Sequence, residues 1–250
     1  MIFVVSGEGP SDIGVCRNGH GECSGNDLKP GPMAAVVDKL VEPIAGFAPL
    51  ASGAVEFVSE GRRLELTKEL PNSFLVGKKR DFQSGYYFKE ARALASLAKR
   101  KSATDRCPVA VVLFRDADGT RSSERGLADL KSKSIEDGFR AEGFDLGVPM
   151  VPKPKSEAWL LCALKTEPYQ HCANLEDALS GNDNSPSPAK VQLAERIGAL
   201  GRGIDDLADM IADGTISPSR IDMPSFNRFR TRLEEVTNRM LGRQTSAQQN

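Results

Sequence analysis

The sequence predicts an α/β protein in which a mostly parallel sheet is covered by helices on both faces. The first observation is residues 109–114, VAVVLF, six consecutive apolar residues, a composition typical of a strand buried on both faces. The second is that apolar runs of strand length alternate with longer segments of helical periodicity. The third is that acidic residues directly follow several of these runs, where open α/β sheets bind their ligands.

Four runs have the length and composition of buried strands: residues 2–5, 54–58, 109–114 and 146–151. Between and after them, apolar residues recur at the spacing of a helix face. The segments concerned are residues 32–41, 86–100, 122–142 and 158–164. Helices between strands provide the long crossover connections that parallel pairing requires. Residues 16–32 are rich in Gly, Asn, Ser and charge, and are expected to form a loop.

Beyond residue 165 the chain changes character. Residues 181–188, GNDNSPSP, have the composition of a linker, and helical periodicity follows at 189–200, 204–212 and 225–241. We therefore expect a core at residues 1–165 and a small helical C-terminal extension at residues 166–250 that packs on it. The last helix carries four arginines, interpreted first as the solvent side of a packed helix and second as a face for nucleic acid. They are Arg228, Arg230, Arg232 and Arg239.

Composition limits the classes of partner. The chain has 250 residues, of which 27% are charged, and a net charge of -1. A protein that coats nucleic acid would be strongly basic, so any contact with nucleic acid is expected to be local. No apolar run approaches the roughly 20 residues that cross a bilayer, and the start MIFVVSGEG lacks the features of a signal peptide. We expect a cytoplasmic protein without a membrane partner; oligomeric state is left open.

The five cysteines form an odd set without regular spacing. This favours free thiols in a reducing compartment over a disulfide framework. A zinc site could combine Cys16, His20 and Cys23 with His171 and Cys172. Because that spacing matches no standard zinc finger, buried or surface thiols are the preferred interpretation.

Acidic residues follow three of the four expected strands. Glu8 follows the first, Asp116 and Asp118 the third, and Glu157 the fourth. The carboxyl ends of parallel strands lie at one edge of a sheet, so these carboxylates are expected to converge. Such carboxylates repel one another unless a cation lies between them, and hard oxygen ligands suit Mg²⁺ or Mn²⁺. The alternative for Asp116 and Asp118 is an ordinary turn closed by a glycine.

Several motifs resemble those of a known family. FVVSGEGPSD resembles the first motif of Toprim domains, the topoisomerase and primase module, and VVLFRDADG resembles the second. VPKPKSEAWLLCAL and PSFNRF are similar to segments of small standalone Toprim-like proteins, which are related to OLD-type nucleases and occur among bacterial and phage-defence genes. The resemblance covers residues 1–165 well and implies a Toprim-like, Rossmannoid core.

The resemblance also implies an activity. It makes the chain a divalent-metal-dependent nuclease, hydrolysing the phosphodiesters of DNA or RNA with Mg²⁺ or Mn²⁺. Glu8, Asp116 and Asp118 would be the metal-binding acids, Glu157 a further acid, and Asp12 a support. Lys153 or Lys155 would stabilise the pentavalent phosphate, as a lysine does in OLD-type sites; a basic loop without a special role is the alternative.

Features of larger relatives are absent from the sequence. Topoisomerases need a catalytic tyrosine, and none of Tyr86, Tyr87 and Tyr169 lies in a matching motif. OLD proteins carry an ATPase in the same chain, but the chain contains no GxxxxGK[ST] loop, so an ATPase partner would be a separate protein. Trp159 lies among apolar residues and is expected to anchor the core.

Two other functions stay open. DADGT also resembles the DxDGT motif of haloacid-dehalogenase-type phosphatases, in which the first Asp is the nucleophile. Lys153 would then bind phosphate, and Asp205 with Asp206 would bind magnesium. That acidic pair should follow a buried strand, however, whereas residues 191–200 have the periodicity of a helix, and GEGPSD stays unexplained. The third hypothesis is a non-catalytic metal-binding partner or sensor.

Overall fold

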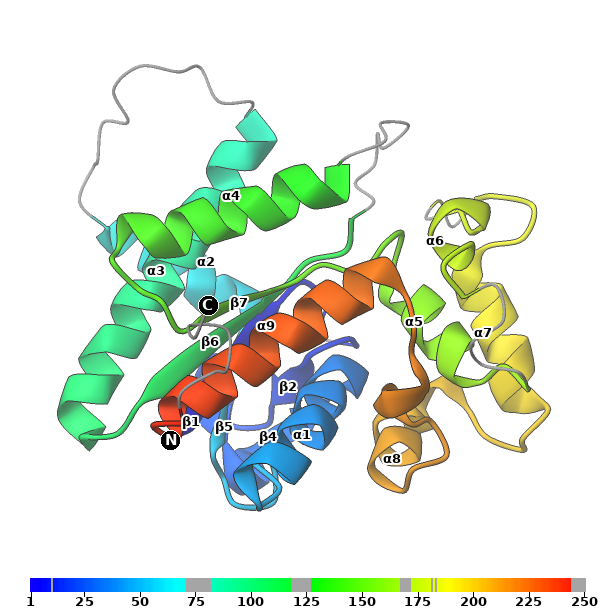
Figure 1. Cartoon of the computed structure of the whole chain (residues 1–250), viewed down its shortest axis with the longest axis horizontal. Helices are drawn as coiled ribbons and strands as arrows, with labels where there is room; N and C mark the ends of the chain where they lie inside the picture. Colours follow the sequence, from blue (N-terminus) through cyan, green and yellow to red (C-terminus); the bar gives the residue numbers. More distant parts are fainter. Residues whose placement is uncertain are drawn as a thin grey trace, which may run out of the picture.

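The computed structural model describes residues 1–9, 11–70, 82–117, 127–166, 172–180, 182 and 184–243, with side chains from residue 85 in the third range. It contains a five-stranded sheet with helices on both faces (Figure 1). The strand order is β3-β5-β1-β6-β7, and β1, β5, β6 and β7 run parallel while β3 joins the edge antiparallel to β5. The expected α/β class with a mostly parallel sheet is confirmed. The strands are β1 (Ile2–Gly7), β3 (Glu22–Ser24), β5 (Val55–Val58), β6 (Val109–Phe114) and β7 (Gly147–Met150).

The order of the parallel strands contains one reversal. From β1 the chain adds β5 on one side and then crosses to add β6 and β7 on the other. The carboxyl ends of β1 and β6 therefore flank a topological switch point, where connections leave in opposite directions and open a crevice. This is the part of the fold where the sequence places Glu8 and Asp116.

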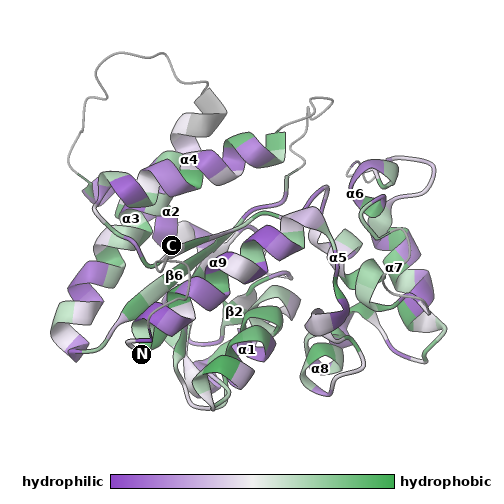
Figure 2. Cartoon of the chain, viewed as in Figure 1, coloured by the Kyte–Doolittle hydropathy of each residue, from purple (hydrophilic) through white to green (hydrophobic). Residues whose placement is uncertain are grey.

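Helices cover both faces of the sheet. α1 (Pro32–Ala45) and α9 (Pro224–Met240) share one hydrophobic core with it, while α2 (Glu60–Glu69), α3 (Phe82–Asp105) and α4 (Leu127–Ala141) lie over the other face. Successive residues of β1 show the pleat, because Phe3 and Val5 enter the first core and Val4 the second. Figure 2 shows hydrophobic and hydrophilic residues alternating along α4 and α9, as expected for helices with one face on a sheet.

Two glycines determine how a helix ends or packs. α1 begins at Pro32, which is pre-organised for a first helical turn, and ends at Gly46, whose φ of 80° is the left-handed conformation of a helix C-cap. α4 packs closely on α3 at Gly138, where a Cβ would lie 2.7 Å from the Cβ of Ala91. The expected helix at 122–142 is present as α4 within the described residues; residues 122–126 lie outside them.

Residues 16–32 do not form the expected loop. They contain β3, a 3₁₀ turn η1 (Gly25–Asp27) and β4 (Leu28–Pro30), which pairs antiparallel with β2 (Gly14–Cys16). Strands of three residues are too short to show an alternating pattern, so their pairing depends on partners elsewhere in the chain. The consequence is that a small two-stranded sheet stands beside the carboxyl end of β1.

The expectation of free thiols is wrong for four of the five cysteines. Disulfides join Cys16 to Cys23 and Cys162 to Cys172, with Cα separations of 5.7 and 5.6 Å, and Cys107 is free. The zinc-site alternative fails for the same reason, because its three cysteines are all paired; His171 lies outside the described residues. Nothing in the spacing of the cysteines along the chain indicates these pairs.

The C-terminal part is helical and packs on the core. It follows α5 (Ser156–Ala163), the last helix of residues 1–165. It contains α6 (Leu175–Ala178), α7 (Ala189–Gly198), η2 (Ile204–Asp206), α8 (Leu207–Ala212), η3 (Pro218–Arg220) and α9. Trp159 is fully buried and stacks with Phe229 at 5.6 Å, which confirms it as a core anchor. Asp205 and Asp206 lie in η2 between two helices rather than after a strand. No helix of the described ranges has the length and apolar composition to cross a membrane.

The arginines of α9 are engaged with the protein itself. Arg228 pairs with Asp129, Arg239 pairs with Asp145, and Arg232 donates to the carbonyl oxygens of Asp145 and Gly147. Arg230 donates to the side chain of Asn227. These contacts match the first interpretation of the helix, an element that packs on the sheet with its arginines along the surface.

Candidate active site at the carboxyl edge of the sheet

Glu8 joins the ends of β1 and β6 across the switch point. Its Oε1 accepts a hydrogen bond from the backbone N–H of Asp116 at 2.8 Å, and its Oε2 accepts one from Nη1 of Arg115 at 2.8 Å. The turn that carries Glu8 requires Gly9, because its φ is +75° and a Cβ there would lie 2.6 Å from a carboxylate oxygen of Asp12. The sequence predicted this approach of Glu8 to Asp116.

Ser156, the first residue of α5, connects the other acids. Its backbone N–H donates to Oδ1 of Asp116 at 3.0 Å, and its hydroxyl donates to Oδ1 of Asp12 at 3.0 Å. The same hydroxyl lies 3.5 Å from Oε2 of Glu157. The N-terminus of a helix favours a carboxylate, which helps to hold Asp116 there. We call Glu8, Asp12, Asp116 and Glu157, which these contacts bring together, the acid cluster.

Charge accumulates in the acid cluster. Burial raises the pKa of Asp12 above its ordinary value, the hydrogen bond from Ser156 opposes this, and the charges of Glu157 and Glu8 raise it further. Within the described ranges, no three His, Cys, Asp or Glu side chains already surround one point as metal ligands. Asp118 lies outside those ranges. The chemistry of the donor set, carboxylates only, fits Mg²⁺ or Mn²⁺.

A buried ionic network supports the cluster from behind. Glu90 of α3 is fully buried and accepts hydrogen bonds from Nε of Arg63 at 2.8 Å and Nη2 of Arg115 at 2.6 Å. Burial lowers the pKa of Arg115, but Glu90 and Glu8 outweigh this and raise it, so its guanidinium stays charged. We call Arg63, Glu90 and Arg115 the Glu90 network; through Arg115 it reaches the carboxylate of Glu8.

The network also fixes the end of β1. Nη1 of Arg63 donates to the carbonyl oxygen of Gly7 at 2.7 Å and to the hydroxyl of Ser6 at 2.8 Å. The rings of Tyr86 and Tyr87 lie 5.5 and 5.6 Å from the guanidinium carbon of Arg115, within the range of cation–π attraction. Glu8 is thus held from both its backbone and its side chain.

Lys131 contacts the backbone of the acid cluster. Its Nζ donates to the carbonyl oxygen of Asp116 at 2.7 Å, and its side chain is almost wholly buried beside the ring of Tyr87. Lys155 directly precedes Ser156 as the N-cap of α5 and is half-buried.

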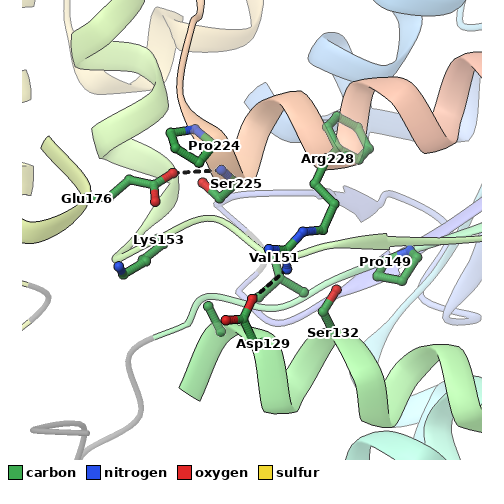
Figure 3. A pocket seen from close by; sticks show the side chains of 11 residues that line it. Asp129, Ser132, Pro149, Val151, Lys153, Glu176, Pro224, Ser225 and Arg228 are labelled. Atoms are coloured by element: carbon green, nitrogen blue, oxygen red, sulfur yellow. Dashed lines mark hydrogen bonds and ion pairs between the residues drawn. The ribbon is translucent and has the colours of Figure 1, made fainter. Parts of the chain in front are cut away.

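Lys153 lies on a different surface from the acid cluster. It pairs with Asp177 at 2.9 Å and lines a cavity of about 120 Å³. Figure 3 shows Lys153 at one side of that cavity, opposite the Arg228–Asp129 ion pair, with Glu176 bonded to the backbone of Ser225. The sequence offered Lys153 or Lys155 for the phosphate, with a basic loop as the alternative. The structure gives the ammonium of Lys153 a carboxylate partner on α6.

Four residues of the site were missed from the sequence: Ser156, Arg115, Glu90 and Lys131. A signal existed for Glu90, because it shares a helix face with Leu94 and Leu97 and is thus a charge within an apolar stripe. Arg115 and Ser156 stand beside acidic residues, and the sequence motifs assign the function to those acids alone. The bonds that Arg115 and Ser156 make reach segments far away in the chain.

Comparison with known proteins identifies no relative: no family model, no curated protein and no solved structure matches the chain. The features of the molecule that bear on its function are the acid cluster, the Glu90 network that holds Glu8, and the position of both at the switch point of the sheet.

Proposed function

We propose that the protein is a divalent-metal-dependent nuclease that hydrolyses phosphodiester bonds of DNA or RNA. The observation that carries the proposal is the acid cluster at the switch point, in which Ser156 contacts Asp12, Asp116 and Glu157. The carboxylate of Glu8 joins it through the backbone N–H of Asp116. The motif resemblance to Toprim-like proteins related to OLD-type nucleases supports the same chemistry independently of the geometry.

In this proposal Glu8, Asp12, Asp116 and Glu157 hold Mg²⁺ or Mn²⁺, and Asp118 joins them on the strength of the DxDG motif alone. A bound ion lowers the pKa of an attacking water and neutralises charge on the leaving oxygen. Surrounding groups that orient metal ligands commonly contribute 10- to 100-fold in affinity or activity. Arg115 would do this for Glu8, and Ser156 for Asp12 and Asp116.

Positive charge for the phosphate would come from lysines near the cluster. Lys131 is held at the backbone of Asp116, and Lys155 adjoins Ser156 at the start of α5. A fixed ammonium group beside a phosphate stabilises the charge that develops in the transition state. Lys153 is assigned the smaller part, because its ammonium is paired with Asp177 of α6.

Partners and location belong to the proposal as well. The resemblance suggests a role in bacterial or phage defence, together with an ATPase on a separate chain, in the cytoplasm. Disulfides are more typical of oxidising compartments, so the two pairs found here make the redox state of the purified chain a direct check on location.

The test is a cleavage assay on plasmid, single-stranded DNA and RNA with Mg²⁺, Mn²⁺ or a chelator. Glu8→Gln and Asp116→Asn remove one cluster charge each, and Asp145→Asn is the matched control, since Asp145 is an exposed acid paired with Arg239. We expect cleavage that needs metal, disappears in both cluster variants and persists in the control. A phosphomonoester is included as a second substrate.

Each other outcome contradicts a specific part of the proposal. Phosphomonoester turnover that needs Asp116 but survives Glu8→Gln would favour the phosphatase hypothesis. Calorimetric Mn²⁺ binding that both cluster variants abolish, without cleavage of any substrate, would favour the non-catalytic hypothesis. Cleavage that survives in both variants would remove the acid cluster from the reaction.

A further inference from the structure

A second concave surface adjoins Glu8 and is lined by residues that do not belong to the acid cluster. This cleft of about 330 Å³ includes Gly7 and Gly9, the two neighbours of Glu8 in the chain. The rest of its lining comes from β2, the segment between β2 and β3, the end of β5 and the start of α2. Six of its lining residues are glycines, so backbone rather than side chains forms much of the wall. We call it the glycine cleft.

For most of these glycines, backbone conformation or a close contact explains why no other residue stands there. Gly9, Gly14 and Gly21 have positive φ, and a Cβ at Gly14 or Gly21 would lie within 2.7 Å of a neighbouring oxygen. Gly61 has no such explanation. It is an exposed residue of α2 with ordinary helical φ, and a Cβ there would meet nothing within 4 Å. Alanine would favour the helix more than glycine does. Neither packing nor conformation requires glycine at this position of the cleft wall.

The lining also indicates the kind of ligand. Val15, an exposed apolar side chain, and Phe57 contribute hydrophobic surface. Among the described residues that line the cleft, Glu60 is charged and none is a lysine or arginine. No described residue of the lining offers a cation to a phosphate. A flat, uncharged ring could stack on the peptide walls and the apolar side chains, and its polar edge could bond to peptide groups and to Glu60.

The size and position of the glycine cleft further limit which ligands it can hold. A volume of about 330 Å³ is at the small end of the range of about 300–1,000 Å³ for ligand sites, which suits one nucleoside unit and not a base pair with its backbone. The cleft begins at the residues on either side of Glu8, so a base placed in it has its phosphate near the acid cluster. We infer that the glycine cleft holds one unpaired nucleobase of the substrate strand, next to the phosphate that reacts.

This inference depends on the proposed nuclease function and adds a substrate class to it. A base in a duplex can enter such a cleft only after unpairing and unstacking, which costs free energy. Single-stranded nucleic acid offers its bases directly, and stacking is tolerant of base identity. The inference therefore predicts preference for single strands with little preference for sequence.

The test measures binding of a labelled single-stranded oligonucleotide by fluorescence anisotropy in chelator, so that no cleavage occurs. Gly61→Trp fills the cleft, and Gly198→Trp is the matched control, because Gly198 is also an exposed helical glycine with nothing near its Cβ. We expect Gly61→Trp to weaken binding by roughly 5- to 150-fold, the effect of losing one stacked base. Gly198→Trp should bind like the unmodified chain, and Gly61→Ala should not lower the melting temperature.

A second variant guards against misfolding. Val15→Glu adds a charge at an exposed position of the cleft and should also weaken binding. Unchanged affinity in both Gly61→Trp and Val15→Glu, or equal affinity for duplex and single strand, would overturn the inference while leaving the nuclease proposal to its own cleavage assay. Metal-dependent cleavage that the cleft variants do not alter would likewise keep the acid cluster and remove the cleft.

Discussion

Glu90→Gln is the sharpest test of how the site is held. Glu90, Arg63 and Arg115 have exposed side-chain fractions of 0%, 0% and 3%, and Glu90 contacts Arg115 at 2.6 and 2.7 Å and Arg63 at 2.8 Å. Glutamine has the same shape, so no cavity forms. Two buried guanidinium groups would lose their shared counter-charge, and breaking a buried pair in this way costs about 3–5 kcal/mol.

The assay is equilibrium unfolding in urea. With a slope of about 1–3 kcal/mol per molar urea, this loss should lower the midpoint by at least about 1 M. Arg62→Gln is the control. Arg62 also has three carboxylates within 3.2 Å, but their side chains are 33% to 64% exposed, so each of its bridges should contribute only about 0–1 kcal/mol.

Equal midpoint shifts for Glu90→Gln and Arg62→Gln would refute the reasoning, because burial would then make no difference. An all-apolar variant, Arg63→Met with Glu90→Leu and Arg115→Met, separates stability from function. Replacing every member of a buried ionic network is often neutral or stabilising, so it should unfold at higher urea than Glu90→Gln. It should still bind Mn²⁺ more weakly than the unmodified chain, since Arg115 no longer orients Glu8.

Three further results are expected. Ser156→Ala should weaken Mn²⁺ binding measured by calorimetry by about 10- to 100-fold without changing the fold, because Asp12 loses its hydroxyl donor. Tyr87→Phe should remove a component with a pKa of about 12 from an alkaline titration of phenolate absorbance, because burial and then Glu8 raise the pKa of Tyr87 from 10.0. Thiol titration of the denatured, unreduced chain should find Cys107 alone.

Each of these has a control or a contrary outcome. Ser102→Ala also removes a hydroxyl donor, but one that bonds to the carbonyl of Cys107, and it should leave Mn²⁺ binding unchanged. The folded phenol of Tyr87 resists ionisation, so its contribution to stability is complete below pH 10 and falls as the pH rises through about 12; Tyr87→Phe should lose less stability there. Five titrated thiols would show that both disulfides are absent.

The local pattern was enough to predict the parallel strands and most of the helices. The strand expected at 109–114 matches β6, since an uninterrupted apolar run has one stable environment, the interior of a sheet. The helix expected at 225–241 matches α9 to within one residue at each end, because an apolar stripe of helical period must cover a core. The local sequence is sufficient where a single helix or strand buries its own apolar residues.

What the sequence determined by itself is that Glu8 lies beside the backbone of Asp116. Glu8 and Asp116 follow apolar runs, and parallel strands bring their carboxyl ends to one edge whatever the details of packing. Tertiary structure decided the rest: that Ser156 links three acids, that Glu90 and Arg115 hold Glu8, that Lys153 faces Asp177, and that small strands form a cleft beside β1. These depend on contacts between residues far apart in the chain, whose partners no local pattern specifies.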